Sequence, residues 1–292
     1  MGYKVHHLNC ATLCMTGGRL LTGKGSFFKR ARMSCHCLLI ETDEGLVLVD
    51  TGFAYKDICN PTFPDTYLAK YFLGATMDLD LCALSQIRAL GYSADDVRHI
   101  VLTHLDPDHS GGLMDFPNAT VHVLAKELRA ATKPVTLWEK ARYMQHMWAH
   151  EPNWKAHTIK GESWYGFESV QVLSSKLFDI LLIPLFGHSR GHCGVAISTE
   201  NGWILHCGDA YFHSSEITKD IATPRGLYWL QSLDDTSRAE RIYNQERLSE
   251  LKKQFGSEIQ LISSHDHDEY DCCKGMVHNL AKSEKRILEV CY

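Results

Sequence analysis

Residues 103–112 decide the fold and read Thr103-His104-Leu105-Asp106-Pro107-Asp108-His109-Ser110-Gly111-Gly112. Two histidines and two aspartates fall within six residues, directly behind the run His99–Thr103, whose centre is apolar. A buried strand would hold these side chains on a rigid rim, and imidazole and carboxylate groups are common ligands of divalent metals. We therefore predict that this stretch supplies half of a site for two metal ions.

Three further segments place a potential ligand just after an apolar run. They are Phe186–His192, which contains His188, His206–Ala210, which contains Asp209, and Ser264–Asp266, which contains His265. The spacing H-x-D-x-D-H is a moderately specific signal by itself, whereas four ligand-bearing segments in order are far more specific. The chain also has 17 histidines, many in short clusters, which favours metal chemistry.

Strands dominate both halves of the chain, and each half also contains helices. The patterns predict strands at Val5–Asn9, Cys35–Glu41, Leu46–Asp50, His99–Thr103, Ala119–Ala125, Ser169–Leu173, Ile180–Leu185, Cys193–Ser198, Gly202–Cys207 and Gln260–Ser264. They predict helices at Leu79–Leu90, from Lys126 onward and within Asp234–Phe255, with a loop at Gly17–Gly23 and one short helix within the irregular residues 53–79. Because strands and helices do not alternate strictly, we expect one α/β (α+β) domain over residues 1–292, with two sheets face to face and helices outside.

Residues 130–168 carry four of the six tryptophans, Trp138, Trp148, Trp154 and Trp164. One interpretation is a second helical layer that packs these rings inward. The other is an aromatic-rich cap over a hydrophobic pocket.

Composition narrows the class of protein. The formal net charge of −5 argues against a general nucleic-acid surface. No run approaches 18 apolar residues and the first 13 residues lack an apolar core, so we expect a soluble, cytoplasmic protein without a membrane partner. The 11 cysteines are an odd number, and most are interpreted as reduced, buried small side chains.

The ordered segments resemble the metallo-β-lactamase superfamily, whose motif is usually written HxHxDH. The resemblance extends over about residues 35 to 268 and includes the strand that ends in Val49-Asp50-Thr51-Gly52. It implies an αββα sandwich with metals at one edge. Among the branches, the chain looks most similar to single-domain hydrolases such as acyl-homoserine-lactone lactonases and glyoxalase II.

The resemblance also implies ligand sets for two divalent metal ions. One ion would take His104, Asp106 and His188, and the other would take Asp108, His109 and His265, with Asp209 and a hydroxide bridging the pair. We interpret Asp50 and His192 as residues that orient ligands.

Position 106 departs from the family, because the motif has histidine where this chain has Asp106. With Asp108, Asp209 and the hydroxide, a bound Asp106 would bring four negative charges, which formally cancel two divalent ions. An additional carboxylate suits harder ions, so we expect zinc with iron or manganese as alternatives.

The implied chemistry is attack of an activated water on a small ester or lactone, with Asp108 relaying a proton and Tyr211 donating to the oxyanion. Alternatives are a thioester hydrolase of the glyoxalase II type and a diiron redox enzyme. A β-lactamase is disfavoured because class B1 enzymes have cysteine where this chain has Asp209 and are secreted, and we expect neither feature here. We expect a small-molecule substrate and no nucleic acid, and the sequence leaves a homodimer open.

Overall fold

The computed structural model describes residues 4–59, 74–76, 78–175 and 178–280. Within them, thirteen strands form two sheets. The first sheet has the order β13 (Val277–Asn279), β1 (Lys4–Leu13), β2 (Met33–Thr42), β3 (Gly45–Val49), β4 (Val97–Val101), β5 (Thr120–Leu124), β6 (Asn153–His157). The second has the order β12 (Ile259–Ile262), β11 (Gly202–His206), β10 (Cys193–Thr199), β9 (Asp179–Pro184), β8 (Phe167–Ser174), β7 (Glu162–Trp164).

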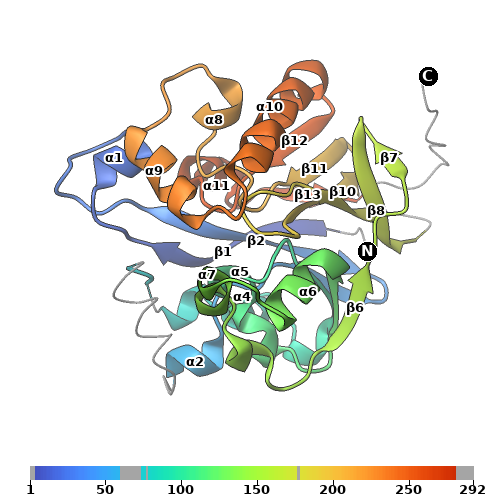
Figure 1. The fold of residues 1–292 in the computed structure, drawn as a ribbon. Helices are drawn as coiled ribbons and strands as arrows, with labels where there is room; N and C mark the ends of the chain where they lie inside the picture. Colours follow the sequence, from blue (N-terminus) through green and yellow to red (C-terminus); the bar gives the residue numbers. More distant parts are fainter. Residues whose placement is uncertain (1–3, 60–73, 77, 176–177, 281–292) are drawn as a thin grey trace.

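Helices cover the outer face of each sheet (Figure 1). Below the first sheet in this view lie α2 (Tyr55–Cys59), α4 (Ala83–Ala89), α5 (Pro107–Ser110), α6 (Ala125–Thr132) and α7 (Leu137–Arg142). The upper part of the view contains α1 (Gly18–Thr22), α8 (Ser215–Thr218), α9 (Arg225–Asp234), α10 (Arg238–Phe255) and α11 (His267–Cys273). Of these, α10 packs on β12 of the second sheet, α11 contacts β1 and β2, and α1 packs against α9. The fold is therefore the predicted mixed α/β sandwich with layers αββα.

Separate apolar clusters fill the spaces between these layers. Leu38, Val49 and Ile180 belong to the cluster between the two sheets. Ile87 of α4 packs under the first sheet, and Leu248 of α10 packs over the second. Burying both faces of each sheet holds the strand ends rigidly, and the loops that follow these ends carry the predicted ligands.

All ten predicted strands are present, with shifted bounds. The hairpin of β2 and β3 is confirmed, and Thr42 pairs with Gly45 at its turn. The predicted helix at 79–90 is interrupted at Cys82, whose backbone is extended, so that α4 begins only at Ala83. The predicted short helix corresponds to α2, whereas residues 60–73 of the same segment lie outside the described residues.

Two predictions of local structure are wrong. The loop expected at Gly17–Gly23 contains α1, which lies between two glycines with positive φ, Gly17 and Gly23. The segment 130–168 is helical only in its first half, since β6 and β7 occupy its second half. Strand β6 reads Asn-Trp-Lys-Ala-His and is an edge strand without an apolar run, which is why its sequence gives no strand signal.

No helix within the described residues is both long and apolar enough to cross a membrane.

Candidate metal centre

The predicted ligands all follow strand ends on one rim of the sandwich. His104 comes after β4, His188 after β9, Asp209 after β11 and His265 after β12. Strands β3 and β4 are parallel, as are β11 and β12, so each pair has its carboxyl ends at one edge. The topology therefore brings ligands far apart in sequence into one place.

A single helical turn positions the aspartates of the opening motif. Asp106 lies just before α5 in extended conformation, and Pro107 occupies the first helical position, where its missing N–H is not needed. The Asp106 carbonyl accepts hydrogen bonds from the backbone N–H groups of His109 and Ser110, at 3.0 and 2.9 Å. This turn directs the side chains of Asp106, Asp108 and His109 toward the rim.

The Asp106 subsite consists of Asp106, His104, His188 and Asp209. Asp106 Oδ2 lies 3.4 Å from His104 Nε2 and 3.1 Å from His188 Nε2. Asp209 Oδ2 lies 3.9 and 3.5 Å from the same two nitrogens.

The Asp108 subsite consists of Asp108, His109, His265 and again Asp209. Asp108 Oδ2 lies 3.7 Å from His109 Nε2 and 3.5 Å from His265 Nε2. Asp209 Oδ1 lies 3.3 Å from His109 Nε2, and Asp209 Oδ2 lies 3.1 Å from His265 Nε2. Asp209 is thus shared by the two subsites.

These spacings fit metal ions. Ligand atoms at about 2.1 Å from a tetrahedral ion are separated from one another by about 3.4 Å, close to the observed distances. In addition, His104 Nε2, His109 Nε2 and Asp209 Oδ1 are buried and have no hydrogen-bond partner among the described residues. Buried polar atoms without partners are costly, and cations at these two positions would satisfy them.

A layer of hydrogen bonds fixes the ligands from behind. Asp50 accepts from the N–H and hydroxyl of Thr103, at 2.8 and 2.7 Å, and from His109 Nδ1 at 2.8 Å. Its φ of 54° is strained for a residue other than glycine, which is typical of a functional position. His192 donates from Nδ1 to the Leu185 carbonyl, and its Nε2 accepts from the N–H of Asp209 at 2.9 Å. Both contacts agree with the orienting roles expected for Asp50 and His192.

Position 208, next to this layer of hydrogen bonds, requires glycine. A Cβ there would lie 2.6 Å from His192 Nε2, and the φ of Gly208 is 54°. The loop before Asp209 therefore packs directly on the histidine that positions it.

Sequence reasoning missed an arginine that contacts the centre. Arg142 of α7 is buried, and its Nε lies 3.4 Å from Asp106 Oδ1. The same guanidinium donates to the His188 carbonyl at 2.7 Å and to the Asp234 carboxylate at 2.6 Å. Asp234 Oδ2 in turn lies 3.6 Å from His188 Nδ1. No motif marks Arg142 or Asp234, because both come from helices whose local patterns contain no ligand signal.

Sequence reasoning also missed a buried glutamate that ties two ligand loops together. Glu127 of α6 accepts from the N–H groups of Leu105 and Gly191, at 3.1 and 2.8 Å, and from the Ser189 hydroxyl at 2.7 Å. It therefore fixes the loop of His104 relative to the loop of His188.

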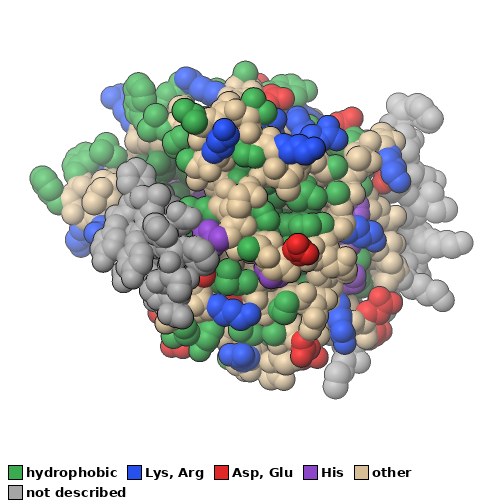
Figure 2. Space-filling view, turned by 60° about the horizontal axis from the view of Figure 1, so that its bottom comes forward, with side chains coloured by type: hydrophobic (Ala, Val, Ile, Leu, Met, Phe, Trp, Pro, Cys, Tyr) green, Lys and Arg blue, Asp and Glu red, His purple; other side chains and the backbone are tan. Residues whose placement is uncertain are grey.

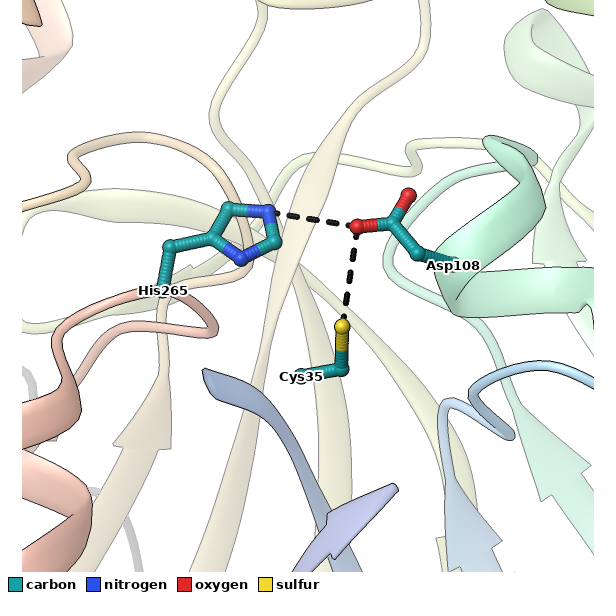
Figure 3. Close-up of side chains that lie close together, drawn as sticks. All are labelled: Cys35, Asp108 and His265. Atoms are coloured by element: carbon teal, nitrogen blue, oxygen red, sulfur yellow. Dashed lines mark hydrogen bonds and ion pairs between the residues drawn. The ribbon is translucent and has the colours of Figure 1, made fainter. Parts of the chain in front are cut away.

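A cysteine lies beside the Asp108 subsite (Figure 3). Cys35 Sγ of β2 is 3.8 Å from Asp108 Oδ2, and its ligand atom groups with those of Asp108 and His265. No motif in the sequence distinguishes Cys35 from the other buried thiols.

Tyr211 is directed elsewhere. Its side chain is fully buried in the cluster over the second sheet, and its hydroxyl donates to the Glu269 carboxylate at 3.0 Å. The hydroxyl is thus engaged by Glu269 in this structure, and donation from Tyr211 to an oxyanion stays a prediction.

The electrostatics of the centre favour positive charge. Burial lowers the pKa of His265, but the charge and hydrogen bond of Asp209 and the charge of Asp108 together outweigh it and raise that pKa to about 9. The pKa of His109 is likewise raised against burial, chiefly by Asp209, then by Asp108 and Asp50. Burial raises the pKa of Asp106, but the Arg142 guanidinium, together with His104 and His188, outweighs burial and holds that pKa well below its ordinary value. A field that stabilises imidazolium also stabilises a divalent cation in its place.

Comparison with known proteins agrees with this geometry. A family model for the metallo-β-lactamase superfamily matches residues 30–242. The chain belongs to the metallo-β-lactamase superfamily, as its motifs predicted, and it is a metal-dependent hydrolase.

The chain is also similar to individual proteins and solved structures of this superfamily. A probable metallo-hydrolase of Mycobacterium tuberculosis is 40% identical over 274 residues, covering 93% of this chain and 83% of the relative. An N-acyl homoserine lactonase of Bacillus thuringiensis is 29% identical over 187 residues, 63% of this chain and 67% of the relative. A similar solved structure is an N-acyl homoserine lactone hydrolase with its product N-hexanoyl-L-homoserine at the catalytic metal center. Its TM-score to this chain is 0.68 at 23% identity, and the match covers 94% of this chain and 97% of that one.

Proposed function

We propose that the chain holds two metal ions and hydrolyses a small ester or lactone. The observation that carries the proposal is the shared position of Asp209, which belongs to both the His104–His188 group and the His109–His265 group. The proposed metal is zinc, with iron or manganese as alternatives because Asp106 adds a carboxylate. The lactonases among the relatives support a lactone as the substrate class.

The residues of the centre have distinct roles in this proposal. When bound, two divalent ions supply an activated water and polarise the carbonyl oxygen of the substrate. Asp108 faces the centre beside His109 and His265, where its carboxylate relays a proton as the leaving group departs. Arg142 compensates the charge of Asp106 and is itself balanced by Asp234.

An apolar wall beside the centre supports a substrate with an apolar part. The ring of Phe212 lies 4.8 Å from that of His265 and 6.1 Å from that of His188. Phe212 belongs to a cluster with Phe53 and Leu227, and Leu227 comes from α9. On its outer side α9 exposes Trp229, so apolar side chains extend from the centre toward the surface.

One face of the molecule shows a mixed surface (Figure 2). Basic and acidic side chains are interspersed on it with apolar ones. Apolar side chains gather at its upper left, on the side where Figure 1 places α1 and α9. Exposed apolar residues of these helices and their flanks are Leu20, Phe27, Phe28, Ile221 and Trp229. This distribution suits a small substrate with an apolar chain.

Metal analysis followed by an activity panel tests the proposal. We expect about two equivalents of metal in the purified protein, loss of activity after chelation, and recovery with zinc, manganese or iron. The panel contains N-acyl homoserine lactones, aryl esters, acyl-glutathione thioesters and phosphodiesters. Failure to open any lactone or ester with metal restored contradicts the proposal. Preference for the thioester indicates a thioester hydrolase, and oxygen consumption by an iron-loaded form indicates a redox enzyme.

A further inference from the structure

Cys35 sits where a ligand of the Asp108 subsite would sit. The residue is 1% exposed, and Figure 3 shows its sulfur and His265 Nε2 both directed at Asp108. Asp108 Oδ2 lies 3.8 Å from Cys35 Sγ and 3.5 Å from His265 Nε2. The three ligand atoms all lie within 4.8 Å of one another. One ion can therefore contact all three.

The separations match coordination around one ion. With zinc–sulfur and zinc–oxygen distances of about 2.3 and 2.1 Å, a tetrahedral angle separates sulfur from oxygen by about 3.6 Å. The observed 3.8 Å also fits a thiol that donates a hydrogen bond to Asp108. The two arrangements differ in the presence of a metal–sulfur bond, which spectroscopy detects.

Strand β2 is positioned to hold both sides of this contact. The N–H of Cys35 donates to Asn9 Oδ1 at 3.0 Å, which fixes the cysteine backbone. The neighbouring carbonyl of Ser34 accepts from His265 Nδ1 at 2.8 Å, which turns Nε2 of this histidine toward the subsite. A second observation points to a cation: His109 Nε2 is buried beside Asp108 without a hydrogen-bond partner among the described residues.

We propose that Cys35 is a thiolate ligand of the metal ion held by Asp108, His109 and His265. On binding, the sulfur–hydrogen bond breaks, its proton goes to solvent, and the sulfur forms a bond to the metal without any change of oxidation state. The Asp108 subsite then has a softer donor set than the Asp106 subsite, whose ligands are two imidazoles and two carboxylates. Soft thiolate favours zinc or cobalt, whereas an oxygen-rich set accepts iron or manganese, so the two subsites differ in metal preference.

The inference rests on the proposed metal centre and is independent of the substrate. Cobalt(II) reports the bond directly, because thiolate ligation produces an intense near-ultraviolet charge-transfer band. We expect this band in wild-type protein loaded with two equivalents of cobalt. It should be lost in Cys35→Ser and in Cys35→Ala, with cobalt at this subsite bound about tenfold more weakly or worse, since losing groups that only orient ligands costs about that much.

The matched control is Cys37→Ser. Cys37 lies on the same strand two residues away and is equally buried, but it belongs to no candidate ligand group of the described residues. This variant should keep the band. Absence of the band from doubly loaded wild type, or its survival in Cys35→Ser, overturns the inference, and the wild-type measurement decides even if the variants fold poorly. Lactone hydrolysis without the band refutes Cys35 ligation alone, whereas the band without hydrolysis of esters or lactones refutes the proposed function alone.

Discussion

Two groups of histidines in this chain have opposite environments. In the metal centre, His109 and His265 face the carboxylates of Asp108 and Asp209. In a second group on the first sheet, the histidine row, His99, His122 and His157 come from β4, β5 and β6 and contact one another. His122 Nε2 lies 3.0 Å from His99 Nδ1, and His122 Nδ1 lies 3.0 Å from His157 Nε2.

The histidine pKa values of the two groups are shifted in opposite directions. Carboxylates raise the pKa of His265 to about 9, whereas burial, followed by the neighbouring His99 and His157, lowers the pKa of His122 to about 3. The hydrogen bonding of the ring nitrogens also differs between the two groups. His104 Nε2 and His109 Nε2 have no hydrogen-bond partner among the described residues, whereas both ring nitrogens of His122 have one. The abundance of histidine is therefore a weak sign of metal chemistry, and carboxylates facing unsatisfied imidazoles are the informative feature.

Removing the shared carboxylate tests this distinction most strongly. Asp209→Asn keeps the side-chain shape but removes the charge common to both subsites. We expect less than one equivalent of metal and a fall in hydrolysis of at least about a thousandfold, on the order of 4 kcal/mol. Elemental analysis and kcat/KM on the best substrate measure the two effects.

The histidine row supplies the control for this variant. His122→Gln removes a buried histidine that belongs to no candidate ligand group of the described residues. It should retain the wild-type metal content at neutral pH. If Asp209→Asn also keeps two equivalents of metal, Asp209 is not a shared ligand and the comparison fails.

Asp50 tests whether the carboxylate behind a ligand matters. Asp50→Asn preserves the approximate shape but weakens the charge-assisted hydrogen bond to His109 Nδ1. We expect metal affinity to fall by about 10 to 100-fold, measured by competition with a chelator of known affinity. An unchanged affinity would mean that the strand and turn hold His109 without help from Asp50.

Whether a feature of the fold or site could be predicted depends on whether its signal lies in the local sequence. The predicted ligands are recognisable because each follows an apolar strand, and that position can be seen in the local sequence. Arg142, Glu127 and Cys35 were missed because their contacts depend on how helices α6 and α7 and strand β2 pack against the rim. Strand β6 was missed because an exposed edge needs no apolar run.

Asp106 offers a smaller test within the centre. Asp106→His restores the residue usual in the superfamily motif but breaks the ion pair with Arg142. We expect the ratio of zinc to iron taken up from an equimolar mixture to rise by roughly tenfold, or about 1.4 kcal/mol, because imidazole replaces a hard carboxylate. Equal uptake ratios in the two proteins would show that Asp106 pairs with Arg142 without binding metal.

The histidine row predicts the smallest effect, a change in the pH dependence of stability. The pKa of His122 is about 3 in the folded chain and about 6.5 when unfolded. Below about pH 6.5 the unfolded chain therefore binds a proton that the folded chain does not, so stability present above this pH is lost as the pH falls toward about 3. From pH 7 to 5.5 this one group costs about 1 kcal/mol.

Urea unfolding of metal-free wild type and His122→Gln at these two pH values measures the difference. Metal is removed first because acid would also release it from the centre. The variant should lose about 1 kcal/mol less than wild type between pH 7 and 5.5, whatever its absolute stability. Equal losses would mean that the row accepts a proton while folded, as the histidines that face carboxylates in the metal centre do.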